Sequence, residues 1–257
     1  MRFSVLGSGS KGNCTLVEAG STRVLIDNGF SGKEIVSRLR TLGIAPESLT
    51  AILVTHEHDD HVKGVGVLAR RLHLPVYANE ATHRAAEART GALPVRLDFG
   101  AGEPFAIERL RIHPFSVSHD AVDPVGFVLS DGDHSLGYCT DTGIVTRLIH
   151  HHLRHCQALI LEANHDVQML KEGPYPLPLQ QRVLSSRGHL ANADSLRLAA
   201  QLAGEQLRLV VLAHLSEINN RPELVRREAH RCLPGQEALQ VLLAGQGQAS
   251  PLLELVL

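Results

Sequence analysis

The sequence predicts an α/β protein in which two β-sheets pack face to face, with helices on their outer sides. Each half of the chain begins with strand-like apolar runs and continues as an alternation of strands and helices. Hydrophobic residues make up 44% of the 257 residues, which is ample for a sizeable core. Because this length suits one large α/β unit, we expect a single domain over residues 1–257.

The first half opens with three successive strand-like runs, RFSVLG, CTLVEAG and TRVLID, the last two joined by a turn at Gly20. The segment GKEIVSRLRTLGI is predicted to be a helix, because its apolar residues recur close to helical spacing and Gly43 lies near its end. Two more strands and two more helices follow by the same criteria: strands at 51–55 and 74–79, helices at 62–72 and 82–89.

The second half begins with β-structure over residues 105–140, in which Asp131-Gly132 marks a hairpin. Strands and helices then alternate to the end of the sequence. The expected helices are 145–155, 193–203 and 222–233, and the expected strands are 158–163, 207–214, 238–245 and 252–257.

The composition limits the kind of partner. With 25 basic and 27 acidic residues the net charge is −2, so any polyanion must be held by a local site. Tryptophan is absent and aromatic residues are only 4%, which argues against a broad base-stacking surface. None of the four cysteines forms a CxxC pair, and we find neither a signal peptide nor an apolar membrane span. We therefore expect a cytoplasmic protein with reduced thiols and no membrane partner.

The stretch THEHDDH at residues 55–61 places three histidines and three carboxylates directly after the apolar run AILV. His56 and His58 are two residues apart in extended chain, so both rings can face one point. Asp60 and His61 follow where the chain turns into a helix, so they can face a second point nearby. A cation offsets the repulsion between the carboxylates and binds neutral imidazoles, so the pattern favours a metal site over a solvated loop.

HEHDDH resembles the HxHxDH signature of the metallo-β-lactamase superfamily. Later motifs of that superfamily also find matches in the same order: His119 in SVSHD, Asp141 in YCTDTG and His214 in LAHLS. The resemblance implies an αββα four-layer sandwich with a dinuclear site between the sheets. One metal ion would be bound by His56, His58 and His119, the other by Asp60, His61 and His214, and Asp141 would bridge them.

The two divalent ions implied by the resemblance would be zinc or manganese, and iron also suits this ligand set. Two divalent cations outweigh the two aspartates and a bridging hydroxide, which favours an anionic substrate such as a phosphodiester. The segments LGSGSKGN, NHDVQML, SSRGHLAN and LAHLSEINN resemble the YycJ (WalJ) branch of the superfamily. That branch, related to ribonucleases J and Z, is regarded as a group of 5′-to-3′ DNA exonucleases. The interval from Asp141 to His214 is too short for the additional domain of the β-CASP nucleases.

GHLAN contains two further candidates, His189 and Asn192, just before the helix expected at 193–203. One interpretation is structural, with Asn192 as the helix cap and His189 exposed. The other is functional, because a helix N-terminus attracts phosphate and a neighbouring histidine can protonate a leaving oxygen. In related nucleases a histidine in this part of the chain does so. We favour the functional interpretation.

The opening loop GSGSKGN lacks the GxxxxGK[ST] pattern, so a Walker site is not expected. Its glycines permit a tight turn, and the resemblance places the loop near the cleft. Ser8, Ser10 and Asn13 are therefore candidates for substrate contacts.

The sequence leads to the hypothesis of a metal-dependent hydrolase acting on nucleic acid, most simply DNA. Asp60 would orient the attacking water or take its proton, and His189 would protonate the leaving group. Two alternatives stay open: a thioester or lactone hydrolase of the same fold, and a regulatory metal-binding module with little catalysis. The oligomeric state is also open, a homodimer being one option.

Overall fold

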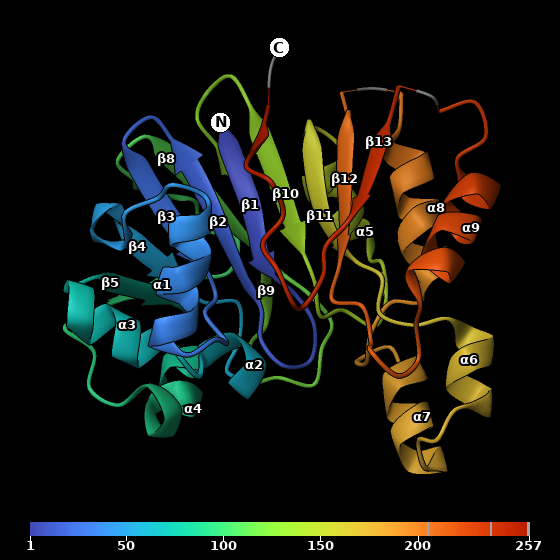
Figure 1. Ribbon diagram of the computed structural model, residues 1–257, viewed down its shortest axis with the longest axis horizontal. Helices are drawn as coiled ribbons and strands as arrows, with labels where there is room; N and C mark the ends of the chain where they lie inside the picture. The colour runs from blue at the N-terminus through green and yellow to red at the C-terminus, as the bar shows by residue number, and fades with distance from the viewer. Residues whose placement is uncertain (205, 237, 256–257) are drawn as a thin grey trace.

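The structure is a computed structural model that describes residues 1–204, 206–236 and 238–255. Two seven-stranded sheets face each other, and helices cover the outer face of each (Figure 1). The strand order is β14-β1-β2-β3-β4-β5-β6 in the first sheet and β13-β12-β11-β10-β9-β8-β7 in the second. The predicted four-layer αββα arrangement is therefore confirmed.

The first sheet starts with an antiparallel meander and continues with parallel strands. Its strands are β1 (Arg2–Gly7), β2 (Cys14–Ala19), β3 (Thr22–Ile26), β4 (Ala51–Leu53), β5 (Pro75–Ala78), β6 (Val95–Asp98) and β14 (Leu253–Glu254). Its helices are α1 (Gly32–Thr41), the short 3₁₀ helix η1 (Pro46–Ser48), α2 (Asp59–Val62), α3 (Val65–Leu72) and α4 (Glu80–Thr90).

The second sheet repeats this plan, with antiparallel pairing from β7 to β10 and parallel pairing from β10 to β13. Its strands are β7 (Phe105–Ile107), β8 (Leu110–Ser116), β9 (Val125–Ser130), β10 (Ser135–Cys139), β11 (Ala158–Glu162), β12 (Leu209–Ala213) and β13 (Gln240–Leu243). Its helices are α5 (Arg147–Leu153), α6 (Val167–Glu172), α7 (Leu177–Leu184), α8 (Asn192–Leu202) and α9 (Pro222–Cys232).

The central strands carry apolar residues on both faces because both faces are buried. In β3, Val24 and Ile26 point to the core between the sheets, while Leu25 points to the core under the helices. This alternation is the ordinary consequence of the two-residue period of a strand. The second sheet has the same arrangement, with Leu161 and Leu212 packed beneath its helices.

Most of the predicted elements are present, and the differences are local. The helix predicted over residues 62–72 is divided into α2 and α3, since Gly64 lies against the backbone of Phe30 where a side chain would collide. Helices α6 and α7 and strand β6 were not predicted. The strand predicted at 252–257 is present as β14, and residues 256–257 lie outside the described part of the chain.

Two expectations about the chain as a whole can be compared with the structure. The four cysteines form no disulfide, and Cys139 is fully buried in the core beneath α5 rather than at the site. Among the described residues, no helix has the length and apolar character needed to cross a membrane.

Candidate metal centre and substrate cavity

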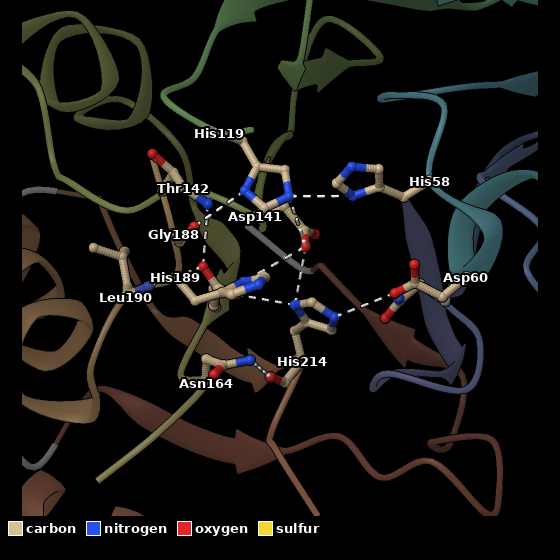
Figure 2. Close-up of polar contacts among 12 residues, drawn as sticks. His58, Asp60, His119, Asp141, Thr142, Asn164, Gly188, His189, Leu190 and His214 are labelled. Carbon is tan, nitrogen blue, oxygen red and sulfur yellow. Dashed lines mark hydrogen bonds and ion pairs between the residues drawn. The ribbon is translucent and has the colours of Figure 1, made fainter. Parts of the chain in front are cut away.

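The candidate site lies where strand ends of both sheets meet. His56 and His58 follow β4, and Asp60 and His61 lie in α2, directly after that loop. Three residues come from the second sheet: His119 after β8, Asp141 after β10 and His214 after β12. Figure 2 shows His58 and Asp60 on one side, His119 and His214 on the other, and the Asp141 carboxylate between them.

The donor atoms of these seven residues fall into overlapping groups. In each group the donor atoms lie within 4.8 Å of one another: His56, His58 and His119; Asp60, His61 and His214; and His56, His61 and Asp141. Asp141 also forms a fourth group with Glu162, His189 and His214. The structure therefore brings together the full ligand set that the sequence suggested, with Asp141 in contact with both halves.

Two buried atoms indicate that this set suits a cation. Within the described residues, Nε2 of His56 and Oδ2 of Asp141 are buried and have no hydrogen-bond partner. Leaving a buried polar atom unsatisfied costs about 1–3 kcal/mol. Imidazole nitrogens and a carboxylate oxygen facing one point are the donors that divalent transition metals prefer, so the residues fit a divalent metal cofactor.

On the first-sheet side, the ligand histidines are held by Asp27, which follows β3. Its Oδ2 accepts hydrogen bonds from His61 Nδ1 at 2.8 Å and from Thr55 Oγ1 at 2.9 Å. The Thr55 hydroxyl in turn lies 2.9 Å from His56 Nδ1 and can accept its proton. His61 and His56 therefore both direct Nε2 toward the metal site, as supporting hydrogen bonds do in metal centres.

On the second-sheet side, the corresponding support is Glu162, the last residue of β11. Its Oε1 accepts hydrogen bonds from Nδ1 of His189 at 2.6 Å and of His214 at 2.9 Å. Its Oε2 accepts from the backbone N–H groups of Thr142 and Leu190, both at 3.1 Å. Glu162 is fully buried, and this network satisfies its carboxylate completely. His119 is held differently, with Nδ1 donating to the carbonyl oxygen of Gly188 at 3.0 Å.

Neither Asp27 nor Glu162 was identified from the sequence. The available signal was an acidic residue directly after an apolar run, VLI before Asp27 and ALIL before Glu162. A buried carboxylate needs a compensating partner, so an acidic residue in such a position points to a histidine or cation nearby. The sequence gives no indication of which histidine it meets.

The electrostatics of the centre show that it requires positive charge. Burial raises the pKa of the Asp141 carboxyl, but His214 and His61 outweigh burial and hold that pKa below its usual value. Burial lowers the pKa of His214, yet Asp141 and the contact with Asp60 raise it well above normal. Burial, with a smaller contribution from His61, lowers the pKa of His56 and keeps that ring neutral. Burial lowers the pKa of His61, but Asp141, Asp60 and Asp27 outweigh burial and raise that pKa well above normal.

The backbone at the strand ends is bent in a way that non-glycine residues rarely adopt. Five described non-glycine residues have positive φ, and three of them belong to this centre: Asp27 at 60°, Asp141 at 54° and His214 at 55°. Left-handed backbone at a non-glycine residue costs free energy and concentrates at functional sites. Each of these residues follows its strand at a sharp turn into the site.

Two side chains of the opening loop, Ser8 and Asn13, contact the metal-ligand candidates. Ser8 Oγ accepts a hydrogen bond from His214 N at 2.8 Å and donates one to Asn13 Oδ1 at 2.9 Å. Asn13 Nδ2 lies 3.1 Å from Asp60 Oδ2 and from His61 Nε2. Both side chains are buried, and neither lines the cavity described below, so the expected substrate contact of Ser8 and Asn13 stays a prediction. Only Ser10, of the three candidates, is exposed and lines the cavity.

His189 and Asn192 have separate roles. His189 Nδ1 is bonded to Glu162, and its ring lines the cavity with its side chain 21% exposed. Asn192 does not cap the helix: α8 begins at Asn192, and its N-cap is Ala191. Its buried amide instead pairs in both directions with the amide of Asn220, at 2.9 and 2.8 Å. The side-chain oxygen and nitrogen of Asn192 are therefore both hydrogen-bonded to Asn220.

A cavity of about 240 Å³ opens onto the centre. Metal-ligand candidates form one wall, and helix α7 with Tyr175 just before it forms the other. Its lining residues are Ser10, His58, Asp60, His119, Asp120, Asp141, Asn164, Tyr175, Leu179, Arg182, Val183, Gly188, His189, His214 and Ser216. A larger cavity of about 1070 Å³ lies between α9 and β13, but it contains none of these groups.

Comparison with known proteins identifies the family. The family described as "Beta-lactamase superfamily domain" matches residues 22–214, which include all seven ligand candidates. The chain belongs to the β-lactamase superfamily. Within this superfamily, the exodeoxyribonuclease YycJ of Bacillus anthracis is 38% identical over 235 residues, which is 91% of this chain and 89% of that protein. The exodeoxyribonuclease WalJ of Streptococcus pneumoniae is 39% identical over 241 residues, 92% and 88% of the respective chains.

A solved structure gives the same result for the fold. The metallo-β-lactamase fold protein YhfI from Bacillus subtilis superposes with a TM-score of 0.75, covering 97% of this chain and 98% of its own, at 19% identity. The resemblance of HEHDDH and the later motifs to the superfamily, and of the whole chain to its YycJ-like branch, is confirmed by these comparisons.

Proposed function

We propose that this protein is a dinuclear metal-dependent phosphodiesterase that acts as a 5′-to-3′ exonuclease on DNA. The observation that carries the proposal is the convergence of seven metal-ligand candidates at one centre, five of which line a small cavity together with His189. The similarity to two exodeoxyribonucleases over about nine-tenths of the chain supports the choice of substrate. Zinc or manganese would occupy the two positions, since imidazole-rich sites with carboxylates suit either ion.

The charge of the centre does not select the substrate. The positive net charge expected from the sequence counted only Asp60 and Asp141. Asp27 and Glu162 also belong to the centre, and the four carboxylates together equal the charge of two divalent cations. Attraction for an anionic substrate must then come from the edge of the cavity. Arg182 lines the cavity, and Lys63 lies exposed just after α2. These cations favour a phosphodiester over an uncharged thioester or lactone.

Each catalytic role follows from the position of a side chain. Divalent ions bound here would supply an activated water and stabilise the charge that develops on the phosphoryl oxygens. The Asp60 carboxylate is partly exposed in the cavity and lies 3.5 Å from His61 and His214, where it can orient water or accept its proton. His189 uses Nδ1 on Glu162, which directs its other ring nitrogen to a leaving oxygen in the cavity.

Metal analysis combined with a DNA digestion assay tests this function. Protein loaded with zinc or manganese is given 5′-phosphorylated, 5′-labelled DNA, matched RNA, and thioester and lactone substrates. We expect two ions per chain and stepwise release of nucleotides from the 5′ end of DNA. Absence of hydrolysis of DNA and RNA, together with turnover of the thioester or lactone, would show that the chain is a different hydrolase of this fold.

A further inference from the structure

The 240 Å³ cavity has two chemically unlike walls. One consists of the metal-ligand candidates and other polar groups. The other contributes the apolar and aromatic surface of the cavity, and all of it comes from one segment: Tyr175 just before α7, with Leu179 and Val183 within that helix. A ligand that fits both walls must carry an anionic group at one end and a flat apolar group at the other, as a nucleotide does.

The size of the cavity restricts how much of a nucleic acid can enter. Pockets for drug-sized ligands usually measure roughly 300–1,000 Å³, and this one lies just below that range. It therefore suits about one nucleotide better than a stacked duplex. A cavity of this size next to the hydrolytic centre favours a strand that presents its end.

A second cavity, of about 400 Å³, adjoins the first at Ser10 and Asp60, and charged groups of both signs line it. Its cations are Lys11, Lys63 and Arg89. Lys11 is paired with Glu217 at 2.6 Å and Arg89 with Asp59 at 2.6 Å. Lys63 is exposed and forms no ion pair with any residue that the structure describes. Figure 1 shows α2 and α7 on opposite sides of the lower end of the sandwich. Residues of α2 line the second cavity, and residues of α7 line only the first.

We propose that the cavity under α7 binds the terminal nucleotide, with Tyr175 and Leu179 as the platform for its base, and that Lys63 holds the backbone of the retained strand. This assignment rests on the proposed nuclease function and goes beyond it by naming the residues that recognise the strand end. Aromatic platforms and basic grooves are the two means by which proteins hold single strands without reading their sequence.

The position of His189 determines which end enters. His189 lines the terminal-nucleotide cavity and lies outside the cavity that contains Lys63, so the oxygen that it protonates belongs to the nucleotide being released. In that step, water oxygen bonds to phosphorus, the bond from phosphorus to O3′ of the terminal nucleotide breaks, and O3′ takes a proton from His189. The water proton passes to Asp60. Arg182, on the same wall as Tyr175, then faces the 5′-phosphate, and its pairing with Asp120 leaves other guanidinium donors free.

A coupling experiment tests the base platform. Wild type and Tyr175→Ala are compared on 5′-phosphorylated single-stranded DNA with either an intact or an abasic first nucleotide. In the wild type, loss of the first base should raise KM on the order of tenfold, the usual value of one base on an aromatic ring. Tyr175→Ala should raise KM similarly on intact DNA, and removal of the base should then have no further effect. Tyr175→Phe should restore the dependence on the base.

Two matched controls separate the platform from general damage. Leu179→Ala should act in the same direction as Tyr175→Ala. Leu177→Ala removes a leucine from the same helix that is 64% exposed and does not line the cavity, so it should have no effect. If Tyr175→Ala raises KM by the same factor on abasic as on intact DNA ends, the ring does not contact the base and the proposal is wrong.

The salt dependence of DNA binding tests Lys63. Lys63→Gln should lower the slope of log Kd against log salt by about 0.7 for a single strand, the value of one phosphate contact. The control is Lys33→Gln, an exposed lysine of α1 that lies outside both cavities. Equal slopes for Lys63→Gln and wild type would refute the backbone contact. If the wild-type protein cleaves no DNA at all, the nuclease function itself fails, which is a different outcome from normal cleavage without coupling to the first base.

Discussion

The two halves of the metal centre use the same chemistry but differ in how they are distributed along the chain. The first-sheet half occupies the single stretch from Thr55 to His61, with Asp27 behind it. The second-sheet half takes His119, Asp141 and His214 from three loops and has Glu162 behind it. Both halves place a buried carboxylate at a strand end, where it accepts the Nδ1 proton of a ligand histidine.

The difference lies in what each carboxylate supports. Asp27 supports metal-ligand candidates only, His61 directly and His56 through the Thr55 hydroxyl. Glu162 supports one ligand, His214, and one residue with a different proposed role, His189. With the roles proposed above, the first half would only hold metal, whereas the second would join metal binding to proton transfer. Five substitutions test this division, beginning with the residue that both halves share.

Asp141→Ala should have the largest effect, because Asp141 belongs to donor groups on both sides of the centre. We expect metal content to fall from two ions to at most one, and DNA hydrolysis to fall to the level of chelator-treated protein. Metal analysis and the 5′-labelled DNA assay measure both quantities. Asp133→Ala, in the exposed β9–β10 hairpin, is the control. Retention of two ions and of activity would mean that the halves do not share Asp141.

His189→Ala should separate proton transfer from metal binding within the second half. We expect kcat to fall by about 10²–10⁴-fold, the usual contribution of a general acid, while metal content stays at the wild-type level. A thymidine 5′-phosphate ester of p-nitrophenol provides the decisive measurement, since its leaving group needs no proton. The variant should lose much less activity on that ester than on DNA, and equal losses on the two substrates would exclude the acid role.

Glu162→Gln and Asp27→Asn compare the two supporting carboxylates directly. In each variant an NH₂ group replaces a carboxylate oxygen that accepts backbone hydrogen bonds in the wild type. The backbone N–H groups would then face another hydrogen-bond donor. Loss of such a supporting residue typically costs about 10–100-fold in metal affinity. Competition with a chelator should show this loss in both variants, with Glu223→Gln on the exposed surface as the control.

The difference between the two variants should appear in turnover. Glu162→Gln should also lower kcat at saturating metal, because it disturbs His189, and Asp27→Asn should recover nearly full kcat once metal is saturating. Recovery of both variants to the same kcat would show that Glu162 supports metal alone.

The same contrast explains how much of the centre could be predicted from sequence. HEHDDH is contiguous, so its spacing after an apolar strand was enough to indicate a metal site. His119, Asp141 and His214 were placed by resemblance, since no local pattern brings three separate loops to one point. The sheets were predictable because buried strands are apolar on both faces, as Leu25 and Ile26 illustrate.

What the sequence did not reveal depends on tertiary contacts. Glu162 looked like the end of a strand, and only the arrival of His189 and His214 from other loops makes it a support. Asn192 was expected to contact substrate, with a helix cap as the alternative, and nothing in the sequence indicated that the amide of Asn220, which arrives after β12, pairs with it. Helices α6 and α7 are short and lie among prolines, so their apolar spacing is too brief to stand out, although α7 provides a wall of the cavity.

Ser8→Ala should have the smallest effect, and it tests whether the two halves are joined through the opening loop. Ser8 bonds the backbone of His214 in the second half and the side chain of Asn13, which in turn contacts Asp60 and His61 in the first. Its removal leaves the His214 N–H buried and unpaired, which costs about 1–3 kcal/mol. Each kcal/mol lowers Tm by roughly 2–4 °C in a protein of about this size. Because Ser8 holds the backbone of His214 and not its ring, metal affinity should fall less than in Glu162→Gln. Ser37→Ala, on the exposed face of α1, should leave Tm unchanged, and a Ser8→Ala protein as stable as that control would mean that the halves are held together by the sheets alone.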